Sequence, residues 1–402
     1  MRTTVAVLGA AAVFLAACAD PGSEQAASDD ATGAANGEPL RDEAVGCEDV
    51  DFYWDDANCE PATLIDLDEV VSGGPPPDGI PPIDDPSFES VEEAATWLDD
   101  DSPVMVVEVD DDVRAYPLAI LTWHEIVNDE LGGVPMVVTY CPLCNSALAF
   151  ERTIEGPDGE QLVLDFGTSG RLYKSNLIMY DRQTHHLWTQ FDGEAVIGDE
   201  QLLGADLERV PAWLLGFSEF ADAHPDAPVL SRDTGFDRDY GRNPYQGYDG
   251  EDAQPFLFDG EIDERFPPMT RVVGLEEDGE ATAVLLELLT EERVAPVEVG
   301  GQSLVVLWAP GQASALDTAA IDEGREVGQT GAFVAELDGE PVDLEPREDG
   351  RFVEPETGSV LDVRGRVIEG PLEGERLEPV IHDDTFWFVW TAFRDDTGVV
   401  DS

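Results

Sequence analysis

Two stretches of the sequence, which start at residues 132 and 300, decide the fold class. The first is GGVPMVVTYCPLCNSAL at 132–148, and the second is GGQSLVVLWAPGQASAL at 300–316. Each opens with two glycines, continues through an apolar run rich in β-branched residues and then reaches a proline. Such a run bounded by turn residues is typical of a buried strand. Aligned without a gap, the two stretches match at Gly132 and Gly300, at Pro142 and Pro310, and at Leu148 and Leu316.

Similar pairs of stretches occur in the same order on either side of these two. They are VEVDDDVRAYPL from Val107 with VGLEEDGEATAV from Val273, TQFDGEAVIG around Gly193 with DVRGRVIEG around Gly365, and WLLGFSEFADAHPD from Trp213 with FWFVWTAFRDDT from Phe386. Repetition at nearly one spacing indicates a duplicated structural unit. The sequence therefore predicts an α+β fold made of two duplicated, mainly antiparallel, strand-rich modules with short helices.

Changes in composition predict where the parts of the chain begin and end. We expect a lipoprotein signal peptide at 1–18, a disordered acidic tether at 19–45, and a small segment at 46–72 stapled by a Cys47–Cys59 disulfide. The first repeat module, with the CPLC motif, spans 73–255. The second, a degenerate module without the cysteines, spans 256–402.

The N-terminal pattern predicts where the protein is located. Arg2 precedes a short apolar run, and Leu15-Ala16-Ala17-Cys18 fits the lipobox of bacterial lipoproteins, so we expect Cys18 to carry lipid. The run is too short to span a membrane as a permanent helix. The expected location is therefore the extracytoplasmic face of the cell membrane, where a disulfide between Cys47 and Cys59 is favoured.

The charge of the chain excludes one class of partner. It carries 88 acidic residues against 21 basic ones, a formal net charge of −67, and Lys174 is the one lysine. Phosphate backbones would be repelled, so no nucleic-acid partner is expected. The acidity suits either a high-salt habitat, where ions screen the repulsion, or a genome whose base composition favours acidic residues. A protein or small-molecule partner is not identified by the sequence.

The CPLC motif, Cys141 to Cys144, is the strongest candidate for chemistry. The gapless alignment sets Cys141 against Ala309 and Cys144 against Gln312, so the second copy lacks both sulfurs. The strand that precedes the motif and the strand that follows it favour a hairpin knuckle, which can direct two sulfurs at a metal. A structural disulfide and a redox pair remain alternatives.

Two thiolates need further ligands to hold most metal ions. His124 is the expected third ligand and Met179 a possible fourth, and this soft set would suit copper(I), with zinc as an alternative. Each residue also has a structural interpretation, since His124 follows Trp123 in an apolar stretch and Met179 lies within NLIMY.

The predicted function is therefore a metal-binding or redox-active surface protein centred on Cys141 and Cys144, with His124 assisting. A thiol–disulfide oxidoreductase and a non-catalytic binding module are the alternatives, and the sequence does not establish whether the protein is an enzyme. FGTSGRLYKSN could form either an anion nest or a tight strand connection. The residues expected to line a cleft are Ser169, Arg171, Asn176, Asp181, Arg238 and Tyr240.

Several long stretches together resemble the DUF3179 family of secreted bacterial and archaeal proteins. They are GGPPPDGIPPIDDPSF, RAYPLAILTWHEIVND, GGVPMVVTYCPLCNSALAFER, LDFGTSGRLYKSNLIMYDRQTHHLWTQFDGEAVIG, VLSRDTGFDRDYGRNPYQGY and FWFVWTAFRDDT. The resemblance runs from about Gly73 to Thr397 and implies no particular activity. The positions that match the family pattern are His124, Glu125, Asn128, Cys141, Pro142, Cys144, Ser146, Gly167, Ser169, Gly170, Asn176, Met179, Tyr180, Asp181, Trp188 and Gly193.

Overall fold

The computed structural model describes residues 62–250 and 252–401. The predictions for Cys18, Cys47 and Cys59, and those for the signal peptide and the tether, lie outside the described residues. Within them, none of the helices is long and apolar enough to cross a membrane. The strand-rich, mainly antiparallel architecture confirms the predicted α+β class.

The first module begins with a five-stranded sheet whose order is β16-β4-β5-β17-β3. Its strands are β3 (Phe88–Glu89), β4 (Pro103–Val109), β5 (Asp112–Pro117), β16 (Ala212–Gly216) and β17 (Val229–Leu230). The hairpin of β4 and β5 turns after Val109, at the run Asp110-Asp111-Asp112, and aspartate is a residue that favours turns. Helix α1 (Val91–Ala94) begins with a capping box formed by Ser90 and Glu93, a pair whose spacing in the sequence is typical of a helix start.

A second sheet carries the CPLC motif. Helix α2 (Leu118–His124) follows β5 directly and leads into the sheet β15-β8-β7-β6. The strands are β6 (Ile126–Leu131), β7 (Val134–Cys141), β8 (Ser146–Glu151) and β15 (Arg209–Val210). Strand β7 is one of the two inner strands of this sheet, most of its apolar run is buried, and it ends at Cys141. The predicted hairpin knuckle is therefore the turn between β7 and β8.

A third sheet, of order β1-β14-β13-β12-β11-β2, packs against the turn. Its strands are β1 (Ala62–Thr63), β2 (Val70–Ser72), β11 (Phe166–Tyr173), β12 (Asn176–Asp181), β13 (Leu187–Thr189) and β14 (Ala195–Gly198), and the 3-10 helix η1 (Leu67–Glu69) lies between β1 and β2. Strands β9 (Thr153–Glu155) and β10 (Gln161–Val163) form a separate hairpin. Helix α3 (Phe217–Ala223) follows β16.

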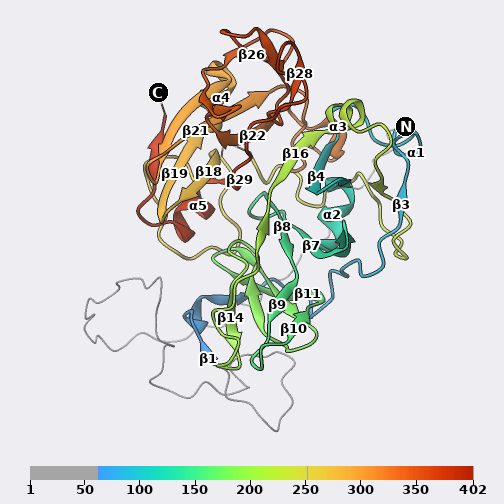
Figure 1. Cartoon of the computed structure of the whole chain (residues 1–402). Helices are drawn as coiled ribbons and strands as arrows, with labels where there is room; N and C mark the ends of the chain where they lie inside the picture. Colours follow the sequence, from blue (N-terminus) through green and yellow to red (C-terminus); the bar gives the residue numbers. More distant parts are fainter. Residues whose placement is uncertain (1–61, 251, 402) are drawn as a thin grey trace, which may run out of the picture. The chain divides into compact units, whose positions relative to one another are not determined.

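The second module repeats the elements from β4 to β17 in the same order, except β15. Figure 1 shows its strands in orange and red beside the cyan and green strands of the first module. They are β18 (Arg271–Glu277), β19 (Glu280–Leu285), α4 (Leu286–Glu292), β20 (Val294–Val299), β21 (Gln302–Ala309), η2 (Ile321–Glu323), β22 (Gln329–Val334), β23 (Glu336–Leu337), β24 (Glu340–Pro341), β25 (Glu345–Pro346), β26 (Phe352–Glu354), β27 (Ser359–Leu361), β28 (Val367–Glu369), β29 (His382–Phe386), α5 (Trp387–Phe393) and β30 (Gly398–Val400). The sheet β29-β18-β19-β30 has the pairing directions of β16-β4-β5-β17. The predicted duplication is confirmed.

The pairings correct the gapless alignment at the motif. Cys141 pairs with Ser146 across the first turn, whereas Ala309 pairs with Gln329 in the second module. The second copy therefore replaces the four residues 142–145 with the long excursion 310–328, and neither Gln312 nor Ser314 is the counterpart expected from the alignment. The gapless alignment implies that the second copy builds the same turn without cysteines. This is wrong, because the second copy builds a different connection.

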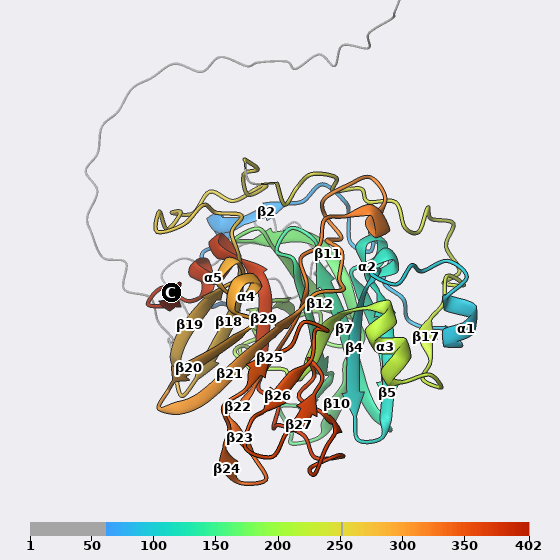
Figure 2. The same ribbon diagram turned by 90° about the horizontal axis from the view of Figure 1, so that it is seen from above.

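A segment without strand or helix at its described residues, 231–250 and 252–270, joins the modules; we call it the linking segment. It passes α2, where Tyr240 meets His124, then the β11–β12 turn, where Ser175 bonds to Phe256, and finally α5, where Trp387 bonds to Asp263 (Figure 2). The module boundaries at 73–255 and 256–402 stay predictions. Three apolar clusters draw residues from both modules, such as the cluster that contains Trp188 and Trp390.

Candidate functional site

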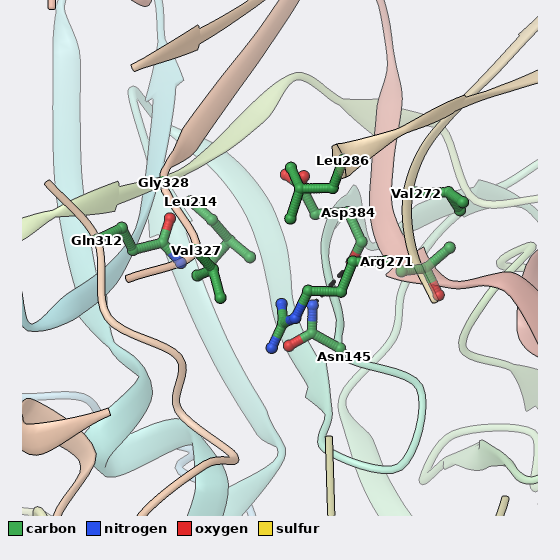
Figure 3. A pocket seen from close by; sticks show the side chains of 10 residues that line it. Asn145, Leu214, Arg271, Val272, Leu286, Gln312, Val327, Gly328 and Asp384 are labelled. Atoms are coloured by element: carbon green, nitrogen blue, oxygen red, sulfur yellow. Dashed lines mark hydrogen bonds between the residues drawn. The ribbon is translucent and has the colours of Figure 1, made fainter. Parts of the chain in front are cut away.

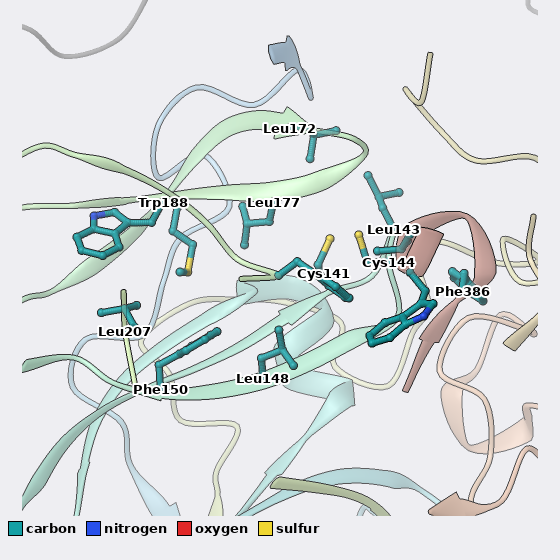
Figure 4. Close-up of a cluster of buried hydrophobic side chains, with 14 of the residues drawn as sticks. Cys141, Leu143, Cys144, Leu148, Phe150, Leu172, Leu177, Trp188, Leu207 and Phe386 are labelled. Carbon is teal, nitrogen blue, oxygen red and sulfur yellow. The ribbon is translucent and has the colours of Figure 1, made fainter. Parts of the chain in front are cut away.

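The two cysteines of the CPLC motif lie on one tight turn. The Cys144 N–H donates to the Cys141 carbonyl at 3.1 Å, and Asn145 adopts a left-handed conformation with φ 53° that returns the chain into β8. Both thiols are free, and the residues are 2% and 0% exposed. Figure 4 shows their sulfur atoms next to each other, among the apolar side chains of Leu143, Leu172 and Leu177.

The sulfur of Cys144 has polar partners on the neighbouring sheet. The side-chain amide of Asn176, the first residue of β12, donates to Sγ at 3.3 Å. The thiol in turn donates to the carbonyl of Ser175 at 3.5 Å. Lys174 and Ser175, both in the left-handed region, make the turn that presents this carbonyl. The β11–β12 connection therefore serves to hold Cys144, which favours the strand-connection interpretation of FGTSGRLYKSN over an anion nest.

A buried network of uncharged side chains supports the turn. Gln190 accepts hydrogen bonds from Asn176 at 2.7 Å and from the Ser146 hydroxyl at 2.9 Å, and donates to the Thr139 hydroxyl at 2.9 Å. Asn176 also accepts from the N–H of Phe191 at 3.0 Å. Because every member has partners, the network restricts the position of Asn176 beneath the sulfur. Sequence analysis did not identify Gln190, which has no motif of its own.

Burial sets the resting protonation state of Cys144. Removal from water raises the pKa of its thiol well above the usual value, and a hydrogen bond with Cys141 raises it further, while the Asn176 amide acts in the opposite direction. The thiol is therefore protonated at neutral pH and is not a ready-made thiolate of the thioredoxin type. Any chemistry at this pair needs a group that removes a proton.

Glu125 is a carboxyl buried beside the cysteines. It is the residue that ends α2, it has φ 59°, and it is 7% exposed. Burial raises the pKa of its carboxyl to about 8, opposed by the hydrogen bond from the Tyr245 hydroxyl, which is 3.5 Å from Oε1. Its backbone carbonyl accepts from the N–H of Tyr140, the neighbour of Cys141, at 2.8 Å. The sequence pattern contained Glu125 only as a family position.

Three tyrosines lie near the two cysteines. Tyr140 comes from β7, whereas Tyr245 and Tyr248 come from the linking segment. Burial raises the pKa of all three hydroxyls, and the charged forms of nearby Cys141 and Cys144 raise those of Tyr140 and Tyr248 further. Tyr248 also accepts from the N–H of Phe256 at 3.1 Å. The linking segment therefore covers the cysteines with aromatic hydroxyls.

His124 lies in a different environment from the one that was predicted. Its Nδ1 lies 2.6 Å from the Pro81 carbonyl and its Nε2 lies 2.7 Å from the Tyr240 hydroxyl, so both ring nitrogens have partners. Burial lowers the pKa of the imidazole, which favours the neutral ring. Within 62–250 and 252–401 no group of three or more His, Cys, Asp or Glu is arranged to hold a metal ion. The predicted set of Cys141, Cys144 and His124 is not assembled.

The other predicted residues are distributed over several environments. Met179 is buried in the apolar cluster that contains the cysteines. Ser169 donates to the carbonyl of Ile178 and accepts from the N–H of Arg171, so it stabilises a strand irregularity. Asp181 accepts from Thr184 and from the N–H of His186 and supports a turn. Tyr240 contacts His124, and the charge of Arg238 helps to lower the pKa of that histidine. Of the six residues predicted to line a cleft, Asn176 donates a hydrogen bond to a cysteine sulfur.

A small pocket lies where the turn meets the second module (Figure 3). Asn145 forms one wall and donates to the carbonyl of Asp384 at 3.3 Å. The Thr385 hydroxyl donates to the carbonyl of Cys144 at 2.8 Å, so β29 holds the turn from the same side. Arg271 also lines the pocket, and its Nε has no hydrogen-bond partner. The second module therefore fixes the position of the CPLC turn.

Comparison with family models finds one match, described as a protein of unknown function, DUF3179, over residues 77–397. The chain belongs to this family. The match covers nearly the whole of both modules and confirms the resemblance seen in the sequence. No curated protein and no solved structure matches the chain. The function of this DUF3179 protein therefore has to be inferred from its own site.

Proposed function

We propose that this DUF3179 protein is a thiol redox protein, in which Cys141 and Cys144 cycle between a dithiol and a disulfide. The observation that carries the proposal is the pairing of two free cysteines on one tight turn, with their sulfurs adjacent (Figure 4). The turn residues and the Asn176 amide hold the pair in place.

The proposed reaction transfers two electrons from the pair to a disulfide acceptor. One cysteine sulfur attacks the acceptor, forms a mixed disulfide and releases the first acceptor thiol. The second cysteine then attacks the bonded cysteine sulfur, closes the Cys141–Cys144 disulfide and releases the second acceptor thiol. We assign the first attack to Cys141, because Cys144 is completely enclosed and its thiol has a raised pKa.

The proposal includes the location predicted from the N-terminal sequence. Leu15-Ala16-Ala17-Cys18 would place the protein outside the cytoplasmic membrane, anchored through lipid on Cys18. Partner disulfides are common in such oxidising compartments, whereas they are rare in the cytosol. A CxxC pair at that location has both oxidants and disulfide-bearing partners available to it.

The test is a redox titration of the full chain with a readout at the level of peptides. The protein is equilibrated with glutathione mixtures of graded potential, and differential alkylation followed by mass spectrometry quantifies the peptide that contains residues 141–144. A reversible two-electron transition supports the proposal, and Cys141→Ser and Cys144→Ser each abolish it. Ser303→Ala, which changes an exposed serine of the second module and leaves both sulfurs in place, serves as the control. A pair that stays reduced at every potential overturns the proposal.

Copper or zinc binding stays a prediction, as does a binding role without chemistry. Metal analysis of the reduced full chain addresses the first: retained stoichiometric copper or zinc that is lost in Cys141→Ser would favour it. If neither metal nor a redox transition is found, and Cys144→Ser only lowers the thermal unfolding midpoint, these results favour a non-catalytic binding module.

A further inference from the structure

The backbone of Glu125 has the same left-handed conformation and the same two hydrogen bonds as the backbone of Arg293 in the second module. The Glu125 N–H donates to the Leu121 carbonyl at 2.7 Å, and its own carbonyl accepts from Tyr140 at 2.8 Å. At the equivalent position Arg293 has φ 63°, donates to Leu289 at 2.8 Å and accepts from Trp308 at 2.9 Å. The fold needs a left-handed residue here, but it does not need a carboxyl.

The two side chains lie in contrasting surroundings. Arg293 is partly exposed, and its guanidinium donates to the carbonyl of Arg347 at 3.0 Å and lies over the ring of Trp308. The Glu125 carboxyl is buried, and the hydrogen bond that it accepts from Tyr245 is long, at 3.5 Å. A buried carboxyl with such weak pairing destabilises a protein. Its presence in the module that has the cysteines, and not in the other, indicates a chemical role.

Glu125 interacts electrostatically with Cys144, and its partner Tyr245 interacts with Cys141. Its charge is close enough to Cys144 to raise the pKa of that thiol. Tyr245, which donates to Glu125, is close enough to Cys141 for the charged thiol to raise the pKa of the tyrosine. Strand pairing sets Ile126 opposite Thr139, so Glu125 lies opposite Tyr140. Tyr140 is the residue that directly precedes Cys141 in β7. The cysteines, Tyr245 and Glu125 thus form one enclosed group.

We propose that Glu125 is the proton acceptor and donor of the Cys141–Cys144 pair. The proposal rests on the redox function proposed above and assigns a residue to its proton transfers. The Glu125 carboxylate removes the proton from the attacking thiol, and the thiolate attacks the acceptor disulfide. The carboxylic acid then returns this proton to the sulfur that leaves. The same cycle serves the second cysteine, so two electrons and two protons pass to the acceptor and Glu125 ends unchanged.

The test compares Glu125→Gln with the wild-type full chain in a thiol reaction followed over a range of pH. A small aromatic disulfide serves as the acceptor, and mass spectrometry of the 141–144 peptide confirms the site of reaction. We expect the variant to react about a hundredfold more slowly near neutral pH, in line with the usual contribution of general acid–base catalysis. The difference should disappear at high pH, where hydroxide removes the thiol proton. Glu125→Asp should recover part of the rate.

Arg293→Gln is the matched control, because it alters the equivalent position of the module without cysteines, and its rate should equal that of the wild type. An unchanged rate and pH profile in Glu125→Gln overturns the role of Glu125, while a reversible transition of the pair in the redox titration leaves the redox function standing. If Glu125→Gln does not fold, a Glu125→Asp variant with the wild-type pH profile overturns the proposal equally. A pair that stays reduced at every potential overturns the redox function by itself.

Discussion

At the scale of single residues, the site combines groups that resist ionisation. The pKa values of Cys144, Glu125 and the surrounding tyrosines are all raised, and burial is the largest cause in each case. The group therefore rests in its neutral, protonated form. Thiols held in the protonated form are poor nucleophiles. They therefore stay unreactive until a base removes their proton and a disulfide substrate is present.

The buried carboxyl of Glu125 makes the free energy of unfolding depend on pH. Unfolded Glu125 loses its proton near its ordinary pKa of 4.5, whereas the folded protein holds it up to about 8. The folded state therefore binds more protons between these values, and stability falls as the pH rises through this window. We expect Glu125→Gln to gain stability relative to wild type by about 1.4 kcal/mol per pH unit within it. Urea titrations at several pH values measure this gain, and parallel stability curves would contradict it.

At the scale of elements, the same contact between a glycine and a phenylalanine ring occurs in both modules. Gly193 before β14 and Gly365 before β28 have φ 75° and 72°. A Cβ at either glycine would meet a phenylalanine ring, Phe150 of β8 at 2.7 Å or Phe333 of β22 at 2.8 Å. These contacts show that β8 and β22 are equivalent strands, as the pairings indicate.

We expect Gly193→Ala and Gly365→Ala to destabilise the protein by similar amounts. Each combines left-handed backbone strain with overpacking against a ring, which together cost about 3 kcal/mol. The control is Gly133→Ala, which has φ 84° and open space around the added methyl, so that only the strain remains. Chemical denaturation measures all three variants. Equal losses in the control and the test variants would show that the rings move aside.

At the scale of the whole molecule, the second module holds in place the linking segment, which covers the cysteines. Asp249 of the linking segment is buried, and its side chain pairs with Arg271 at 2.8 Å and with Arg325 at 2.9 Å. The 310–328 excursion adds backbone bonds, since Gly247 donates to the carbonyl of Leu316 at 2.9 Å. The copy without cysteines thus supports the segment that supplies Tyr245 and Tyr248.

We expect Asp249→Asn to destabilise the protein by about 3 kcal/mol, because it leaves two arginines facing an uncharged buried group. Burial alone would raise the pKa of Asp249, but Arg271 and its other partners outweigh it and hold the pKa below the usual 3.8. Its stabilising contribution is therefore present above pH 3.8 and is lost as the pH falls through the lower folded value.

Urea denaturation near neutral pH measures the effect of Asp249→Asn. Asp349→Asn is the matched control, since its pair with Arg347 is exposed and we expect a loss of less than about 1 kcal/mol. Equal losses in the two variants would show that the Asp249 pairs do not hold the linking segment. The Asp249 variant should also expose Cys141 and Cys144 to alkylating reagents faster than wild type.

Matching residues between the two modules by sequence alone gives some wrong structural counterparts. Val107 was aligned with Val273, but β4 and β18 begin at Pro103 and Arg271, so its structural counterpart is Leu275. A shift of two residues keeps every side chain on the same face of a strand, and the apolar pattern cannot detect it. The excursion 310–328 is hidden in the alignment for a related reason. Ser314 and Leu316 match Ser146 and Leu148 in sequence, although β8 begins at Ser146 and its counterpart β22 begins at Gln329.

By itself, the sequence determined the features that depend on neighbouring residues. These include the strand alternation, the hairpin after Val109, the cap at Ser90, the tight turn of the CPLC motif and the duplication itself. Only the tertiary structure decided what surrounds the thiols. Asn176 and Tyr245 come from separate elements, and His124 turns towards Tyr240. The physical reason is that burial and proximity depend on non-local strand pairing, whose partners are not specified by any local pattern.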